Sequence, residues 1–289
     1  MTKRRWVPHG LVLFVLVLHL SAPAGVYSQV VLNQTLGASV HPLGVSLGTR
    51  AFYRMPLYTR RVGEQPPLLL QNTRIEAGVS NQLTPAFNDV ALDLYFEPLA
   101  ILDLRVRYGW RHAYDAFGFG YMSLPAGGTV APPDFSGDTT NRRGSLLEIT
   151  PRVKVALGPV VFLNGVTLRR ITMDQEDGES EWFYEPLSDE PLRRGDWIVQ
   201  NASTLLYRLP VDTTDQLLVG VDNTLLWTDG DDLRRWRAAA MVVWATQRVV
   251  PSAELSLVAQ VGAYPIHRAY QFSQGELYVA LQAGITRSW

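Results

Sequence analysis

Charged side chains recur at every second position along several segments of the chain. Arg105 and Arg107 are spaced in this way, as are Arg152 and Lys154. Because successive side chains of a β-strand point to opposite faces, this spacing places the charges of one segment on a common face. If such faces line a barrel lumen, they could conduct small polar solutes or be closed by paired side chains. The lumen-lining candidates are Arg74, Glu76, Asp93, Asp103, Arg105, Arg107, Glu148, Arg152, Lys154, Arg208, Asp222, Arg235, Arg237 and Glu254.

Several other kinds of chemistry find no support in the sequence. The chain has no cysteine, which excludes disulfides, thiolate metal sites and cysteine nucleophiles. It has neither the GxxxxGK[ST] motif for phosphates nor the HExxH motif for zinc. The net charge of -1 provides no basic field for nucleic acid. We therefore expect no cofactor, no metal and no nucleic-acid partner.

The elements that position these charges are predicted to be strands. From about residue 30 onward apolar residues alternate with polar ones, a pattern typical of strands with one apolar face. Several runs reach ten or more residues, which fits a tilted crossing of a bilayer better than a strand of a globular sheet. We expect an all-β, antiparallel, up-and-down transmembrane β-barrel of about twelve strands, with ten or fourteen as alternatives. Asn164 interrupts the pattern between Val160 and Thr172, so the phase of that strand stays open.

The connections and the tryptophans predict how the barrel is oriented. Short turns at Glu97-Pro98, Gly158-Pro159, 209–216 and 248–252 alternate with longer polar loops near 115–143, 174–195 and 266–274. Long loops are expected outside the cell. Tryptophans gather near both ends of the predicted strands, as aromatic rings do at the two membrane interfaces. The predicted girdle residues are Trp110, Trp197, Trp227, Trp236, Trp244 and Trp289.

The first 28 residues are predicted to be a secretory signal peptide. Basic residues from Lys3 to Arg5 precede an apolar run from Leu11 to Leu20, and small residues follow. The apolar run is shorter than the roughly twenty residues that span a bilayer. Cleavage is expected after Ala24 or Ser28, leaving 29–289 as the barrel domain.

The C-terminal segment resembles the last strand of bacterial outer-membrane β-barrel proteins. Apolar residues alternate with more polar ones at Leu277, Val279, Leu281, Ala283 and Ile285, and the sequence ends on Trp289. Arg287 departs from the pattern, because such strands usually carry an aromatic residue at this position. The resemblance implies a place in the outer membrane of a Gram-negative bacterium. It also implies contact with lipid and lipopolysaccharide, and assembly through the barrel-assembly machinery. It implies no particular substrate.

The acidic segment 174–195 has two possible roles. It could be an extracellular loop that binds the divalent cations bridging lipopolysaccharide, because carboxylates are suitable ligands for calcium and magnesium. A solvated loop is favoured, since the spacing matches no EF-hand template. The acidic residues are Asp174, Glu176, Asp177, Glu179, Glu181, Glu185, Asp189 and Glu190.

We predict that the chain is not an enzyme. After the signal peptide only His41, His112 and His267 could act as a histidine base, and a Ser/His hydrolase needs that base held by a third group. Outer-membrane phospholipases and lipid A deacylases carry a serine two residues after the histidine, and none of these histidines has one. The expected function is a narrow pore for small polar solutes or a structural barrel of the envelope. A soluble secreted or periplasmic β-sandwich binding protein is the alternative, and an outer-membrane lipid hydrolase is the least favoured.

Overall fold

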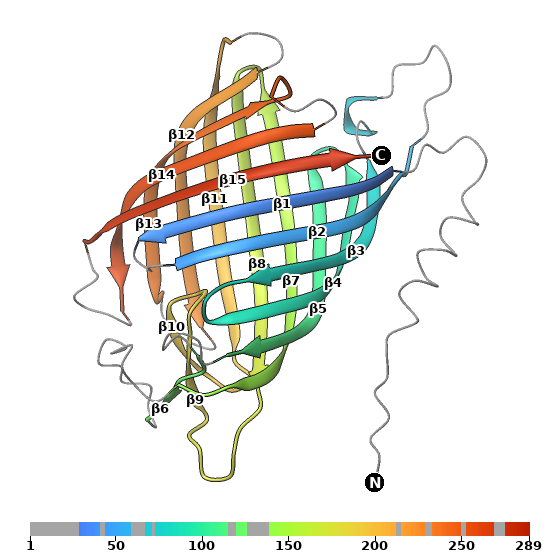
Figure 1. Cartoon of the computed structure of the whole chain (residues 1–289). Helices are drawn as coiled ribbons and strands as arrows, with labels where there is room; N and C mark the ends of the chain where they lie inside the picture. The colour runs from blue at the N-terminus through green and yellow to red at the C-terminus, as the bar shows by residue number, and fades with distance from the viewer. Residues whose placement is uncertain are drawn as a thin grey trace, which may run out of the picture.

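The structure is a computed structural model of the whole chain, shown in Figure 1. It describes residues 29–40, 44–58, 67–70, 73–114, 120–125, 139–211, 215–228, 233–249, 253–268 and 275–289. The predicted signal peptide lies outside these residues. No helix in the described ranges has the length and apolar character needed to cross a membrane.

Twelve strands form one closed antiparallel barrel, as the sequence predicted. The first strand closes the barrel by pairing with the last, with Val31 opposite Ser288 and Val40 opposite Val279. Neighbours along the sheet are neighbours along the chain once the short strands outside the barrel are set aside. The barrel strands are β1 (Gln29–Val40), β2 (Gly44–Pro56), β3 (Arg74–Leu83), β4 (Phe87–Leu99), β5 (Leu102–Ala113), β7 (Arg142–Leu157), β8 (Val160–Met173), β11 (Trp197–Leu209), β12 (Asp215–Thr228), β13 (Arg235–Thr246), β14 (Ala253–His267) and β15 (Leu277–Ser288).

The barrel has an apolar outside and a polar inside, the reverse of a β-sandwich. On β4, Leu92 and Leu94 are 42% and 48% exposed, whereas the intervening Asp93 is 2% exposed. Alternate residues of a strand face opposite sides of the sheet, so the leucines point outward and the carboxylate points into the lumen. A sandwich would bury the leucines between two sheets. The closed barrel therefore rules out the soluble sandwich that the alternation alone left open.

The strands are connected at two different ends. The end where β5, β8 and β14 finish is called the long-loop end here, and the end with the turns after β4 and β7 is the short-turn end. At the former end β5 finishes and β7 begins, and β8 finishes and β11 begins. The alternation of lengths is less strict than predicted. At the long-loop end β3 and β4 are separated only by residues 84–86, whereas at the short-turn end, where the 3-10 helix η1 (Leu68–Leu70) lies, residues 57–73 separate β2 from β3.

Two local predictions are corrected or completed. The turn predicted at Glu97-Pro98 lies further on, because β4 continues to Leu99 and its pairing with β5 shifts register between Phe96 and Leu99. Proline lacks the amide that a regular ladder needs, and such a bulge accommodates it. The strand of open phase, β8, is continuous through Asn164, which pairs with Val153 on β7.

Three short strands form a separate small sheet at the long-loop end, visible at the bottom of Figure 1. They are β6 (Ser123–Leu124), β9 (Trp182–Glu185) and β10 (Glu190–Arg193). The hairpin β9–β10 pairs Glu185 with Glu190, and β6 pairs with β9. We call this sheet, together with the 186–189 turn, the cap.

Candidate functional site: the lumen and its cap

A chain of ion pairs covers the lumen wall from β2 to β8. Asp93 accepts hydrogen bonds from Arg50 at 3.1 Å and from Arg105. Glu76 lies beside three arginines, with distances of 3.1 Å to Arg50, 2.8 Å to Arg54 and 2.9 Å to Arg74. Because each carboxylate sits between several guanidinium groups, its charge is balanced by these neighbouring cations.

The same network continues toward β7 and β8. Glu97 pairs with Lys154 and, at 3.0 Å, with Arg74. Asp103 contacts Lys154 at 3.1 Å and Arg152 at 2.7 Å. The carboxylates are buried while the side chains of Lys154 and Arg152 are 27% and 45% exposed. The wall thus presents the cationic ends to the remaining lumen space and keeps the anionic groups behind them.

A second region of the network lies on the same wall, nearer the long-loop end than Arg152 and Lys154. Glu148 is held between Arg107 at 3.4 Å and Arg169 at 2.9 Å. On the other side of the barrel Asp222 accepts bonds from Arg237 and Thr204, both at 2.8 Å. Each of these carboxylates therefore has at least one basic partner, which suits a closed or weakly selective interior better than an anion path.

The structure places the predicted lining residues in two groups. Most of them belong to the ion pairs just described. Arg208 and Glu254 are exposed, near the short-turn ends of β11 and β14, and form no ion pair among the described residues. Arg235 is 8% exposed and lies near Tyr264, with its guanidinium 5.8 Å from the ring. These three residues lie apart from the wall network.

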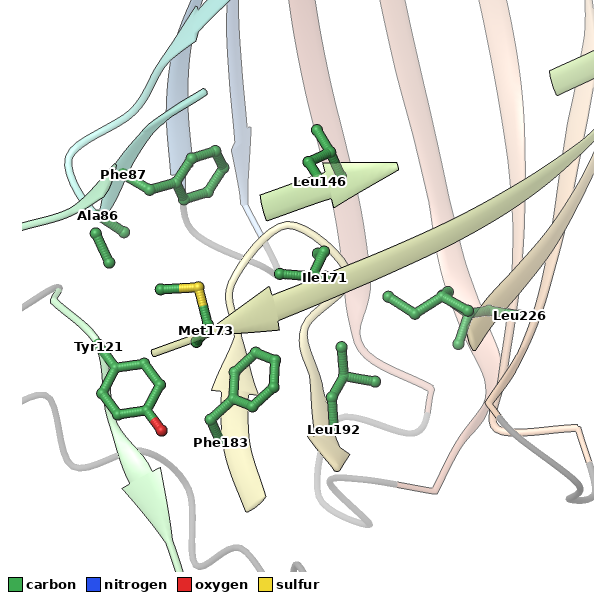
Figure 2. Close-up of a cluster of buried hydrophobic side chains, with 11 residues drawn as sticks. Ala86, Phe87, Tyr121, Leu146, Ile171, Met173, Phe183, Leu192 and Leu226 are labelled. Carbon is green, nitrogen blue, oxygen red and sulfur yellow. The ribbon is translucent and has the colours of Figure 1, made fainter. Parts of the chain in front are cut away.

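The cap closes on the barrel through an apolar core. Phe183 of β9 is 2% exposed and Leu192 of β10 is 1% exposed. They pack with inward-facing side chains of the wall, as Figure 2 shows. Tyr121, next to β6, stacks on Phe183 with ring centroids 5.9 Å apart. The whole cluster contains Ala86, Phe87, Ala113, Tyr121, Leu146, Ile171, Met173, Phe183, Leu192, Ile198 and Leu226.

Buried charges fix the cap to the barrel wall. Glu185 of β9 is fully buried and lies 2.5 Å from Arg111 of β5. The guanidinium of Arg111 also bonds Asp89 of β4 at 2.7 Å and lies 3.9 Å from the ring of Phe87. One arginine thus joins two wall strands to the cap. The expectation that 174–195 is a solvated loop is wrong for this part of it, because the apolar neighbours bury its carboxylates.

On the opposite wall the cap meets His267, the last residue of β14. His267 Nε2 lies 3.2 Å from Asp189 Oδ2, and Tyr184 donates to Asp189 Oδ1 at 2.5 Å. Burial alone would raise the pKa of Asp189, but these two hydrogen bonds hold it below its usual range. Asp189 has a φ of 53°, the only positive value among the non-glycine residues described. The sequence predicts a loop from about residue 266; the structure instead ends β14 at His267 and buries this side chain inside the barrel.

Glu190 is the least satisfied group of the cap. It is fully buried, and neither carboxyl oxygen has a hydrogen-bond partner among the described residues. Its ion-pair partner among the described residues is Arg234, whose Nε is 3.7 Å from Oε2. Burial raises the pKa of Glu190 to about 7, against the opposing pull of Arg235, His267 and Arg234. The cap therefore carries one carboxyl group that changes charge near neutral pH.

The predicted girdle residues occupy both rims of the outer face. Trp110 and Trp236, near the long-loop end, are 58% and 37% exposed, and Trp289, at the other end, is 59% exposed. Trp197, Trp227 and Trp244 are partly exposed and share the outward phase of their strands. The apolar surface between the rims matches a lipid belt.

Several residues of the site were missed from the sequence. Arg111 continues the phase of Arg107, and Asp89 that of Asp93, so a longer extension of the alternation would have found both. Arg169 was not predicted as a lumen residue because Asn164 interrupts the alternation of β8. Nothing in the sequence of 174–195 marks which of its carboxylates are buried. Within the described ranges, no group of three or more metal-ligating side chains could hold a metal ion.

Comparisons with known proteins find a similar fold and nothing more specific. No family model matches the chain, and no curated protein matches it. Among solved structures it is similar to the β domain of the Bordetella autotransporter BrkA, with 9% identity and a TM-score of 0.46 over 92% of this chain and 100% of that one. It is also similar to the translocator domain of the autotransporter NalP from Neisseria meningitidis, with 12% identity and a TM-score of 0.39 over 97% and 94%. The NanC porin matches with 12% identity and a TM-score of 0.39 over 89% and 98%. Values this low carry no argument about function.

Proposed function

We propose that the protein is an outer-membrane barrel with a narrow polar lumen that is closed at its long-loop end by the cap. The closed state blocks the diffusion of solutes through the lumen, and small polar solutes pass only when the cap moves away from the lumen mouth. The seating of Phe183 and Leu192 in the apolar core of the lumen mouth carries this proposal. A cap that merely hung outside the barrel would not bury these side chains.

The outer face supports the membrane location. Leucines and valines are exposed along the strands, with tryptophans at both rims. Exposed apolar surface of this extent is unfavourable in water and favourable in lipid. We propose export by the signal peptide 1–28, assembly through the C-terminal strand β15 and contact of the rims with lipid and lipopolysaccharide in a Gram-negative outer membrane. No catalytic step is part of the proposal.

The polar lumen supports the passage. A barrel of twelve strands lies between the filled eight-stranded barrels and the open sixteen-stranded porins. Among the described residues its wall charges are paired mainly along the wall, as Arg152 is with Asp103, and Arg111 also pairs with Glu185 of the cap. The cap, which is held by Arg111 and the apolar core, is then the part that decides whether solutes pass.

Conductance in planar bilayers tests the proposal. We compare the wild-type barrel with a variant in which Phe183 and Leu192 are both alanine, and with the control Leu69→Ala, which removes an exposed leucine of η1 at the other end. The wild type and the control should stay closed for most of the recording, and the double variant should show discrete steps. A wild type that conducts steadily would refute closure. A folded double variant that never conducts would refute the passage and leave a structural envelope barrel.

A further inference from the structure

A polar patch interrupts the apolar outer face of the barrel. It consists of Asn164 on β8, Asn201 and Ser203 on β11, and Asn223 on β12. Asn164 lies opposite Ser203, and Ser203 lies opposite Asn223, so these three side chains form one row across three strands. All four residues are partly exposed. They are called the amide patch below.

The phase of the strands shows that the amide patch faces outward. On β11, Leu205 and Tyr207 share the phase of Ser203 and are 48% and 49% exposed. The other phase of this strand faces the lumen, where Thr204 donates to Asp222. On β8 the outward neighbour Phe162 is 39% exposed. The patch therefore lies on the lipid side of the barrel.

The position along β11 makes the patch costly for a single barrel in lipid. The outward residues of this strand run from Trp197 at one rim to Tyr207 at the other, and Asn201 and Ser203 lie midway between them. Polar groups at the middle of a hydrocarbon layer lose free energy unless they are hydrogen-bonded. A chain that faced only lipid here would be expected to carry valine or leucine at these positions.

The hydrogen bonds inside the patch do not use all of its groups. Asn164 Nδ2 donates to Ser203 Oγ at 2.7 Å, and the carboxamides of Asn164 and Asn201 donate to each other at 3.4 Å. Ser203 Oγ donates to Asn201 Oδ1 at 3.3 Å, and Asn201 Nδ2 also donates to the carbonyl of Gly165 at 3.5 Å. The indole of Trp236 donates to Asn223 Oδ1 at 2.5 Å. A carboxamide has two N–H donors and can accept two bonds, so these bonds use the full capacity of Asn201. Among the described residues, the donors of Asn223 Nδ2 and one acceptor position each on Asn164 Oδ1 and Ser203 Oγ remain. Because the remaining positions include both donors and acceptors, the patch is complementary to a copy of itself.

We propose that the amide patch is the centre of an interface between two copies of this chain, related by a twofold axis. The same patch on both barrels then supplies donors and acceptors to the other, as twofold interfaces require. Polar and small residues mediate such contacts between membrane segments. Ala238, which pairs with Asn223 on the next strand, is small enough to let the second barrel approach. The proposal rests on the membrane placement of the barrel and not on the closure of its lumen.

The test compares the mass of the folded protein in density-matched detergent and in lipid nanodiscs. The wild type should form dimers. The variant with Asn164→Val, Asn201→Val and Ser203→Ala should dissociate at least about tenfold more readily, as loss of several bonds across a membrane interface predicts. The matched control carries Gln34→Leu and Thr49→Val, a cross-strand pair on the outward face of β1 and β2. This control should remain dimeric.

Cross-linking provides a second measurement that leaves the patch intact. Because the chain has no cysteine, Leu205→Cys and Leu36→Cys each introduce a single thiol. Leu205 lies beside the patch and Leu36 on the far side of the barrel, and they are 48% and 55% exposed. On mild oxidation in membranes only Leu205→Cys should form a covalent dimer. The proposal would be overturned by a wild type that is monomeric, or by a dimer that the Gln34 and Thr49 control disrupts. It would also be overturned if Leu205→Cys formed cross-links only to a different protein. A chain that never enters lipid would instead refute the membrane placement.

Discussion

At the scale of single residues the lumen is organised by shared carboxylates. Asp93 is inaccessible and serves both Arg50 and Arg105, whose side chains are 19% and 30% exposed. A buried carboxylate is stable only when its charge and its lone pairs are both satisfied. Removing it leaves two guanidinium groups near one another with less compensation.

Asp93→Asn should therefore destabilise the barrel by about 3 kcal/mol, near the lower bound for breaking a buried ion pair. The matched change Arg152→Gln should cost less than about 1 kcal/mol, because exposed charges are screened, and this side chain is 45% exposed. Urea unfolding of the protein in lipid vesicles, followed by tryptophan fluorescence, measures both. Equal losses for the two variants would contradict this view of the network.

Glu190 should make the cap sensitive to pH. Its raised pKa of about 7 means that the folded state holds a proton that the unfolded state releases near pH 4.5. The contribution to stability is therefore complete below about pH 4.5 and is lost as the pH rises through about 7. Asp189, His267, Arg234 and Arg235 are the charged or titratable groups that act on it.

Hydrogen exchange of the cap amides, corrected for intrinsic rates, checks this expectation. Protection of β9 and β10 should be several-fold lower at pH 8 than at pH 6, and Glu190→Gln should remove most of the difference. The control Glu181→Gln changes a carboxylate of the same hairpin that is 59% exposed and should leave the response as it is. If Glu190→Gln retains the full response, the dependence belongs to another group.

At the scale of elements the cap and the barrel strands differ in how they could be predicted. The strands of the barrel run from 10 to 16 residues, long enough for alternation to reveal them. Strands β9 and β10 have four residues each, too few for a period to be recognised. Their stability comes from Phe183 and Leu192 inside a core assembled from many separate segments. The sequence alone predicted the barrel strands and most of the charged residues on their inner face, but it could not predict the cap at the long-loop end.

Phe183→Ala should therefore open the cap and leave the barrel intact. Truncating a buried phenylalanine costs about 3 to 5 kcal/mol, and this side chain packs where the cap meets the wall. Hydrogen exchange should rise in β9 and β10 while the amides of β4 and β12 remain protected. A uniform rise over the barrel strands would show that the cap and the barrel unfold as one unit.

At the scale of the whole molecule the barrel reverses the usual arrangement of a globular protein, with apolar side chains outside and charged side chains inside. Leu92 and Leu94 face outward and Asp93 faces inward, and the same arrangement continues around a sheet that closes between β1 and β15. Closure leaves no free strand edge, which is the condition for β-structure in a hydrocarbon layer. The alternation in the sequence predicted one apolar and one polar face for each strand. The pairing of β1 with β15 closes the sheet and shows that the polar face lies inside.

The central claim, that this apolar outer face lies against lipid, is tested most directly by refolding the unfolded chain with and without lipid vesicles. Unheated and boiled samples are then compared by gel electrophoresis. We expect a shifted, protease-resistant band in unheated samples only when vesicles are present, and its loss on boiling. A chain that refolds in buffer without lipid, stays soluble as a monomer and shows no difference between unheated and boiled samples would contradict the claim.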